Sequence, residues 1–75
     1  MSPKSRSRQR QSVPSWVSEG ARIFDPLEDR QGIVQFIGEW ENPTTRTVVA
    51  NAVFARPEGG GREWIVQDPR RLERG

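Results

Sequence analysis

The chain has 75 residues and contains neither cysteine nor histidine. These absences exclude disulfide bonds and thiolate metal sites, and they remove the commonest general base and metal ligand in proteins. The net charge of +2 is unevenly divided, because residues 1–12 hold four basic and no acidic residues, whereas residues 13–75 hold eight basic and ten acidic ones.

Residues 1–12, MSPKSRSRQRQS, are rich in serine and arginine and have no periodic apolar residues. We predict a disordered basic arm here, because nothing in the segment offsets the entropy lost on ordering. The arm either keeps the protein soluble or contacts phosphate groups or an acidic partner. The basic residues of the arm are Lys4, Arg6, Arg8 and Arg10.

The body of the chain, residues 13–75, is expected to form one small domain. After an irregular lead-in, the segment 21–25 is predicted to be a strand, since β-branched and aromatic residues lie at its centre. The segment 25–32 is typical of a turn. In it Asp25 can accept a hydrogen bond from the backbone, and Pro26 presets the chain direction.

Residues 32–40, GIVQFIGEW, form the longest apolar run and the best strand candidate. Strict alternation assigns Val34, Phe36 and Trp40 to one face and Ile33 and Ile37 to the other. Gly38 interrupts the run, which predicts a bulge or a sharp bend. Apolar residues on both faces favour a strongly curved sheet or a closed barrel.

Three further elements follow along the chain. Residues 41–47 are expected to be a turn, because Asn42 is followed by proline. Residues 48–56 are predicted to be the third strand and residues 63–67 the fourth, from their valines and aromatic residues.

The segment 68–72, DPRRL, is typical of the start of a helix. Asp68 is a good N-cap residue, and Pro69 suits the first helical position. Because few residues follow, we expect no more than one helical turn.

Three consecutive glycines lie within RPEGGGREW, residues 56–64. A phosphate-binding loop requires a helix after its glycines, so that helix amides converge on the anion. Here a strand follows, and Glu63 would repel a phosphate. We therefore predict a hairpin loop with an exposed tip from Glu58 to Arg62.

The predicted fold is an all-β small barrel of four to five antiparallel strands with a short C-terminal helical turn. The chain resembles the SH3-like small barrels of the KOW and Tudor type through residues 20–24, a loop, and residues 32–34. DPRRL after the last long strand resembles the 3₁₀ turn near the end of such barrels. The chain also resembles small proteins frequent in actinobacteria. The resemblance implies a binding module. We expect a cytoplasmic protein on separate grounds, because the basic N-terminus is not followed by the apolar segment of a secretory signal and no apolar run could span a membrane.

Trp40 is the first candidate for a contact surface, because Glu39 and Glu41 flank it at a strand end. An aromatic ring beside acidic groups suits a cationic ligand. The predicted partner-binding residues are Glu39, Trp40, Glu41, Glu58, Arg62 and Trp64. The alternative is that the tryptophans belong to the core or its rim.

Arg70 and Arg71 form a second basic cluster. They either complement the end of a short helix or join Lys4, Arg6, Arg8 and Arg10 in contacting phosphate. Asp25, Glu28 and Asp29 are expected to form a solvated acidic turn, not a cation site.

The expected function is that of a non-catalytic protein-interaction adaptor, present as a monomer or homodimer and without metal or other cofactor. The alternative is a DNA- or RNA-binding protein that uses the arm together with the barrel. No apolar run is long enough to span a membrane, so we expect no membrane segment.

Overall fold

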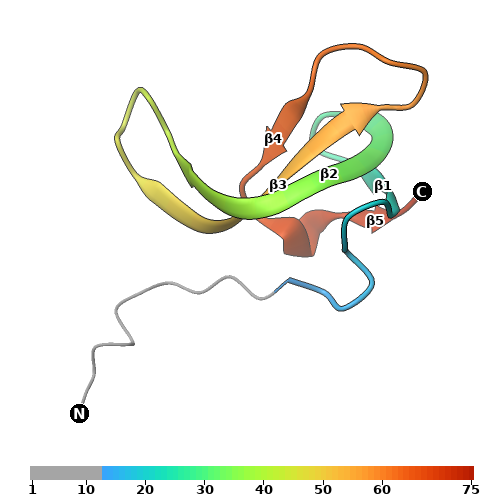
Figure 1. Cartoon of the computed structure of the whole chain (residues 1–75), viewed down its shortest axis with the longest axis horizontal. Coiled ribbons are helices and arrows are strands. Elements are labelled where there is room, and N and C mark those ends of the chain that lie inside the picture. The colour runs from blue at the N-terminus through green and yellow to red at the C-terminus, as the bar shows by residue number, and fades with distance from the viewer. Residues whose placement is uncertain (1–12) are drawn as a thin grey trace.

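The structure is a computed structural model that describes residues 13–75, so the arm expected over residues 1–12 lies outside the described residues. In this range five antiparallel strands form one sheet in the order β4-β3-β2-β1-β5 (Figure 1). The elements are β1 (Arg22–Asp25), β2 (Arg30–Glu41), β3 (Val48–Pro57), β4 (Trp64–Val66), the 3₁₀ turn η1 (Pro69–Arg71) and β5 (Glu73–Arg74). The predicted all-β class is confirmed.

The turns form where the sequence predicts them. The backbone N–H of Leu27 donates to Oδ1 of Asp25 at 3.1 Å, so Asp25 starts the turn after β1. In the turn between β2 and β3, Oδ1 of Asn42 accepts from the backbone N–H groups of Thr44 and Thr45 at 2.8 and 3.2 Å. Where the chain reverses, these side-chain oxygens accept the backbone hydrogen bonds that a neighbouring strand would otherwise accept.

The short helical turn is also confirmed. Asp68 is its N-cap residue and accepts a hydrogen bond from the backbone N–H of Arg70 at 3.1 Å. Pro69 occupies the start of the turn, where a missing N–H costs nothing.

The sheet is not closed into a ring, which differs from the closed barrel considered from the sequence. β4 and β5 are its two edge strands, and within residues 13–75 no β4–β5 pairing completes a barrel. The two strands have three and two residues, and η1 separates them in the chain.

The β2–β3 hairpin extends beyond its neighbours. β1 pairs with residues 30–33 of β2, and β4 pairs with residues 53–55 of β3. Residues 38–52 therefore form a two-stranded ribbon, which Figure 1 shows curving away from β1, β4 and β5.

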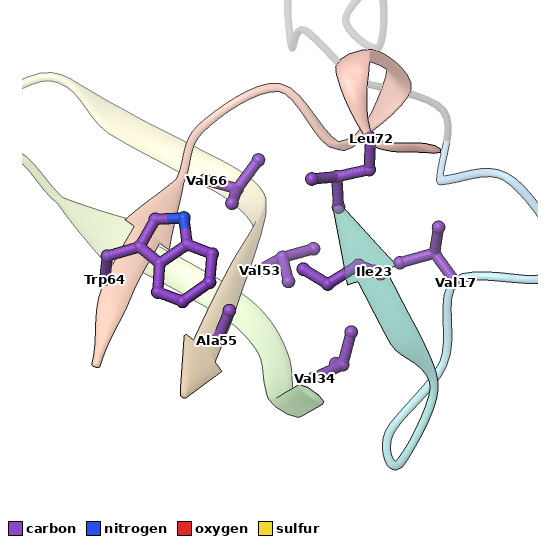
Figure 2. Close-up of a cluster of buried hydrophobic side chains, with 8 residues drawn as sticks. All are labelled: Val17, Ile23, Val34, Val53, Ala55, Trp64, Val66 and Leu72. Atoms are coloured by element: carbon purple, nitrogen blue, oxygen red, sulfur yellow. The ribbon is translucent and has the colours of Figure 1, made fainter. Parts of the chain in front are cut away.

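The core lies on one face of the sheet, where the β4–β3–β2–β1 strands meet the lead-in segment and η1. Ile23, Val53 and Val66 are fully buried at its centre, and Leu72 covers them after η1 (Figure 2). The cluster consists of Val17, Ile23, Val34, Val53, Ala55, Trp64, Val66 and Leu72. Burial of these side chains is the main favourable contribution to folding.

Candidate functional site

The sheet has a second apolar face, opposite the core. On β3 the side chains of Val53 and Ala55 are buried in the core, so Phe54 between them points to the other side. On β4 the same alternation points Ile65 to the side opposite its buried neighbours. Ile65 is also the direct register partner of Phe54. Two apolar side chains therefore lie next to each other away from the core.

Phe36 joins these two residues from β2. It pairs with Phe54 in the register, and the two ring centroids are 5.5 Å apart with the planes tilted by 59°. Phe36 is 50% exposed, and it lies outside the core cluster. Phe36, Phe54 and Ile65 thus form an apolar row across three strands.

This arrangement corrects the faces predicted for β2. The sequence pattern grouped Val34 with Phe36, but Val34 is buried in the core and Ile37 packs against that core. The register shifts between Val34 and Phe36, so Gln35 is an extra residue in β2. Such a bulge reverses the alternation, and it turns Phe36 to the face opposite Val34.

Gly38 allows the Phe36 ring to lie flat on this second face. A Cβ at Gly38 would come within 2.5 Å of the Phe36 ring. Ala52, the register partner of Gly38, is fully buried although it lies outside the core cluster. The Phe36 ring therefore lies directly over Gly38.

Trp40 and Val49 continue the row along the ribbon. They are register partners beyond a second register shift, between Gly38 and Trp40, which adds its extra residue to β3; β2 keeps its alternation there, so Trp40 lies on the same side as Gly38. Trp40 and Val49 are both half-buried. We call the resulting set the outer row; it comprises Phe36, Trp40, Val49, Phe54 and Ile65.

Two exposed charged residues flank the outer row along the strands: Arg56 lies on the same side of β3 as Phe54, whereas Glu39 lies between Gly38 and Trp40 and points to the opposite face. Arg56 is exposed two residues beyond Phe54, and Glu39 is exposed beside Trp40. In residues 13–75 neither of them has an ion-pair partner. The described ion pairs are Arg22–Glu58, Arg46–Glu41, Arg70–Asp68 and Arg71–Asp25.

The predicted partner-binding residues do not form one surface. Trp40, Glu39 and Glu41 lie on the ribbon, whereas Glu58 and Arg62 lie at the exposed tip of the β3–β4 hairpin. Since β3 connects these sites, they are roughly 30 Å apart at 3.3 Å per strand residue. The tip itself matches the predicted hairpin loop, with positive φ angles at all three glycines, Gly59 to Gly61.

Trp64 belongs to the core and not to the surface. It is 8% exposed, and its Nε1–H donates to Oδ2 of Asp25 at 3.0 Å. Gly32 makes room for its ring, because a Cβ there would lie 2.8 Å from the indole. The guanidinium of Arg30 covers the ring at 4.8 Å from its centroid. Trp64 therefore offers no stacking surface.

Asp25 is fully buried, which corrects the expectation of a solvated acidic turn. Nε and Nη2 of Arg71 donate to its two carboxylate oxygens at 2.9 and 2.8 Å. Burial raises the pKa of Asp25, but the hydrogen bonds from Arg71 and Trp64, the charge of Arg71 and the N–H of Leu27 outweigh burial and lower it below the ordinary value. Both oxygens of this carboxylate accept hydrogen bonds from the protein itself, so the role of Asp25 is structural.

The predicted phosphate-binding arginines are paired with carboxylates. Arg71 forms the bidentate ion pair with Asp25 described above. Arg70 forms a second bidentate pair, with both oxygens of Asp68, at 2.9 and 3.0 Å. Their charges are thus engaged within the fold. Lys4, Arg6, Arg8 and Arg10 lie outside the described residues.

The sequence indicated Trp40 but missed Phe36, Phe54 and Ile65 as surface residues. The sequence did hold a signal for a second apolar face, because the strand predicted at 32–40 carries apolar residues on both of its sides, more than one small core can bury. Nothing in the pattern located the bulge that decides which side Phe36 occupies. Within residues 13–75 no group of acidic side chains is arranged to hold a metal ion, and no helix is long and apolar enough to cross a membrane.

Comparisons with protein-family models, with curated proteins and with solved structures find no match to this chain.

Proposed function

We propose that the chain is a non-catalytic protein-binding module whose contact surface is the outer row. The observation that carries this proposal is the half-exposed Phe36 ring, which packs at a tilt against the Phe54 ring on the face opposite the core. An apolar patch that joins several strands costs free energy in water unless another molecule covers it, so such patches mark interaction sites. Aromatic residues also contribute most of the binding energy in protein interfaces.

We further propose that the module is of the SH3-like small-barrel type. Support comes from the five-stranded antiparallel order and from the 3₁₀ turn η1, which lies between β4 and the last strand. Modules of this kind bind through loops, strand edges and aromatic clusters, which agrees with a contact surface on the sheet.

The non-catalytic part of the proposal rests on chemistry. The chain has no histidine or cysteine to act as base or nucleophile. Its one fully buried carboxylate, Asp25, has both oxygens occupied by donors from Arg71 and Trp64. A carboxylate held in this way is not positioned to accept a proton from a substrate.

A photo-crosslinking experiment tests the proposal. Phe36 is replaced by benzoylphenylalanine, which keeps an aromatic ring at that position, and the full chain is irradiated in the cells that produce it. The matched control carries the same group at Leu27, which is 70% exposed in the β1–β2 turn and away from the outer row. We expect a defined protein crosslinked through position 36 and not through position 27.

Two outcomes contradict the proposal. Equal crosslinking from both positions would mean that Phe36 is no more than an exposed apolar residue. Crosslinks from position 36 to nucleic acid would favour the alternative, in which the basic arm and the sheet bind DNA or RNA.

A further inference from the structure

One side of β2 has no neighbouring strand along the ribbon. β1 and the segment before it bond to β2 only as far as Val34, whose C=O accepts from the N–H of Gly20 at 2.8 Å and whose N–H donates to the C=O of Ala21 at 3.0 Å. Residues 35–41 of β2 then have β3 on one side, and no strand among residues 13–75 pairs with the other. We call residues 35–41 the free edge. Its backbone groups on that side can pair with a further strand.

Two glutamates lie on one face of the free edge. Ile37 packs against the core cluster, so side-chain alternation places Glu39 and Glu41 on the same side of β2 as Ile37. Both glutamates are exposed. Glu41 is paired with Arg46, and Glu39 has no ion pair among the described residues. A strand added here meets an acidic face, so basic residues at every second position would match it.

The arm carries its basic residues with this period. In residues 4–10, KSRSRQR, a basic residue alternates with serine or glutamine throughout. In an extended conformation all the basic side chains of such a segment lie on one face, and the uncharged ones lie on the other. Residues 4–10 are also equal in number to residues 35–41, so the two segments match in length.

The chain enters the body on the side of the sheet where the free edge lies. Residues 20 and 21 bond to β2 immediately before the free edge. Figure 2 shows Val17 beside Ile23 of β1, on the opposite side of the core cluster from Trp64. Val13, the first described residue, packs against the same cluster as Ile37. The arm therefore joins the body close to the start of the free edge.

We propose that residues 4–10 of the chain's own arm add to the free edge as a further strand, with the basic residues facing Glu39 and Glu41. This inference goes beyond the proposed function, because it concerns the strand edge and not the outer row. Backbone hydrogen bonds hold the added strand, and the opposite charges decide which of its faces lies over the glutamates. The arm and the edge belong to one chain, which raises their effective concentration.

A second copy of β2 matches this edge less well. Two free edges joined antiparallel would bring Glu39 and Glu41 of both copies onto one face of the joined sheet. Like charges directly opposite each other destabilise a strand pair. The arm brings the opposite charge to the same place.

Paramagnetic NMR of the full chain tests the pairing. The chain has no cysteine, so Ser5→Cys carries a nitroxide spin label at one defined position and leaves the basic residues of the arm in place. The label should broaden the amide signals of residues 35–41 and leave those of the hairpin tip, residues 59–62, sharp. Added salt should reduce the broadening, because it screens the exposed charge pairs. Equal broadening in both places, or none at the free edge, overturns the inference.

Variants of the labelled chain test the charge pattern. Glu39→Arg should abolish the broadening at the free edge, whereas Glu63→Arg, which reverses an exposed glutamate beside β4, should not. Arg8→Gln combined with Gln9→Arg keeps the composition and the net charge but moves one charge to the other face of the strand, so it should weaken the broadening. Arg8→Lys is the matched control and should preserve it. If the exchange of positions 8 and 9 has no effect, charge alone attracts the arm and the strand pairing is wrong.

A mixed sample distinguishes pairing within one chain from pairing between chains. Spin-labelled chains without isotope enrichment are mixed with isotope-enriched chains that carry no label, so any broadening comes from a second molecule. We expect none at the free edge. Broadening as strong as in the labelled, enriched chain would mean that the arm binds another copy, which overturns the intramolecular pairing. These results do not involve the outer row, so crosslinking at position 36 tests the proposed function separately.

Discussion

Asp25 accepts hydrogen bonds from three separate parts of the chain: Leu27 in the next turn, Trp64 on β4 and Arg71 in η1. Trp64 and Arg71 are 39 and 46 residues away in the sequence. One carboxylate therefore ties the end of β1 to the C-terminal part of the fold. In a domain of this size, with a small apolar core, such a link is a large share of the net stability.

Asp25→Asn should lower the free energy of unfolding at pH 7 by about 3 kcal/mol, because Arg71 keeps its charge without a partner carboxylate. Urea denaturation measures this loss. Asp29→Asn is the control in the same turn: Asp29 is exposed and has a positive φ of 55°, which asparagine tolerates. A loss of equal size in both variants would contradict the role given to Asp25.

The effect of Asp25 should depend on pH. Its pKa is lowered in the folded state, so its contribution is complete above the unfolded value of about 3.9 and is lost as the pH falls through the folded value. Wild type should therefore lose stability below about pH 4 more steeply than Asp25→Asn does. If the free energy of unfolding fell equally steeply for both proteins as the pH is lowered, Asp25 would not be the group responsible.

Gly32 and Gly38 give a matched pair of substitutions. A Cβ at Gly32 would collide with the backbone oxygen of Arg56 and lie 2.8 Å from the Trp64 ring, neither of which can move easily. At Gly38 it meets only the far end of the Phe36 ring. Gly32→Ala should cost about 2 to 3 kcal/mol and Gly38→Ala less than about 1, as measured by urea denaturation. Equal costs would contradict these surroundings.

At the scale of elements, strands and turns could be predicted from the sequence because they depend on local chemistry. β-branched residues define β3, Asn42 forms its turn with the next three residues, and Asp68 caps η1. Each of these signals acts within a few residues, so the expected and observed boundaries nearly coincide.

The face assignments and the site could not be predicted, because they depend on contacts that are distant in the sequence. The extra residue Gln35 is visible only once β2 pairs with β3, and it turns Phe36 outward. Asp25 has the sequence pattern of any turn residue, and its partner Arg71 comes from the other end of the chain. Trp64 was indistinguishable from an exposed aromatic residue until Gly32 and Asp25 were placed beside it.

The η1 turn offers a prediction at this scale. Asp68→Ala removes the acceptor for the Arg70 N–H and should destabilise the protein by about 1 kcal/mol, as loss of an N-cap does. Asp68→Asn keeps an acceptor oxygen and should lose less. Thermal unfolding of the two variants measures the difference. If Asn were as damaging as Ala, the cap would not be the source of the effect.

At the scale of the whole molecule, a single sheet divides its apolar residues between two faces. One face packs the core around Val53, and the other holds the outer row around Phe36. The body also engages Arg70 and Arg71 with its own carboxylates, so nucleic-acid binding would depend on Lys4, Arg6, Arg8 and Arg10, which lie outside the described residues.

Deletion of residues 2–12 should therefore abolish any binding of DNA or RNA in a gel-shift series. Binding by the four basic residues of the arm should fall with salt at a logarithmic slope of roughly −3 to −4 in the full chain. Salt-dependent binding by residues 13–75 alone would show that the body has a nucleic-acid surface.

The division into two faces is the central claim, and the unfolding free energy of Phe36→Thr tests it most directly. Threonine suits a strand, so the substitution removes the ring without disfavouring β2. If Phe36 belongs to an exposed contact surface, the loss should be about 1 kcal/mol, the energy of one aromatic pair. A loss of about 3 kcal/mol or more, as for a core phenylalanine, would contradict the account.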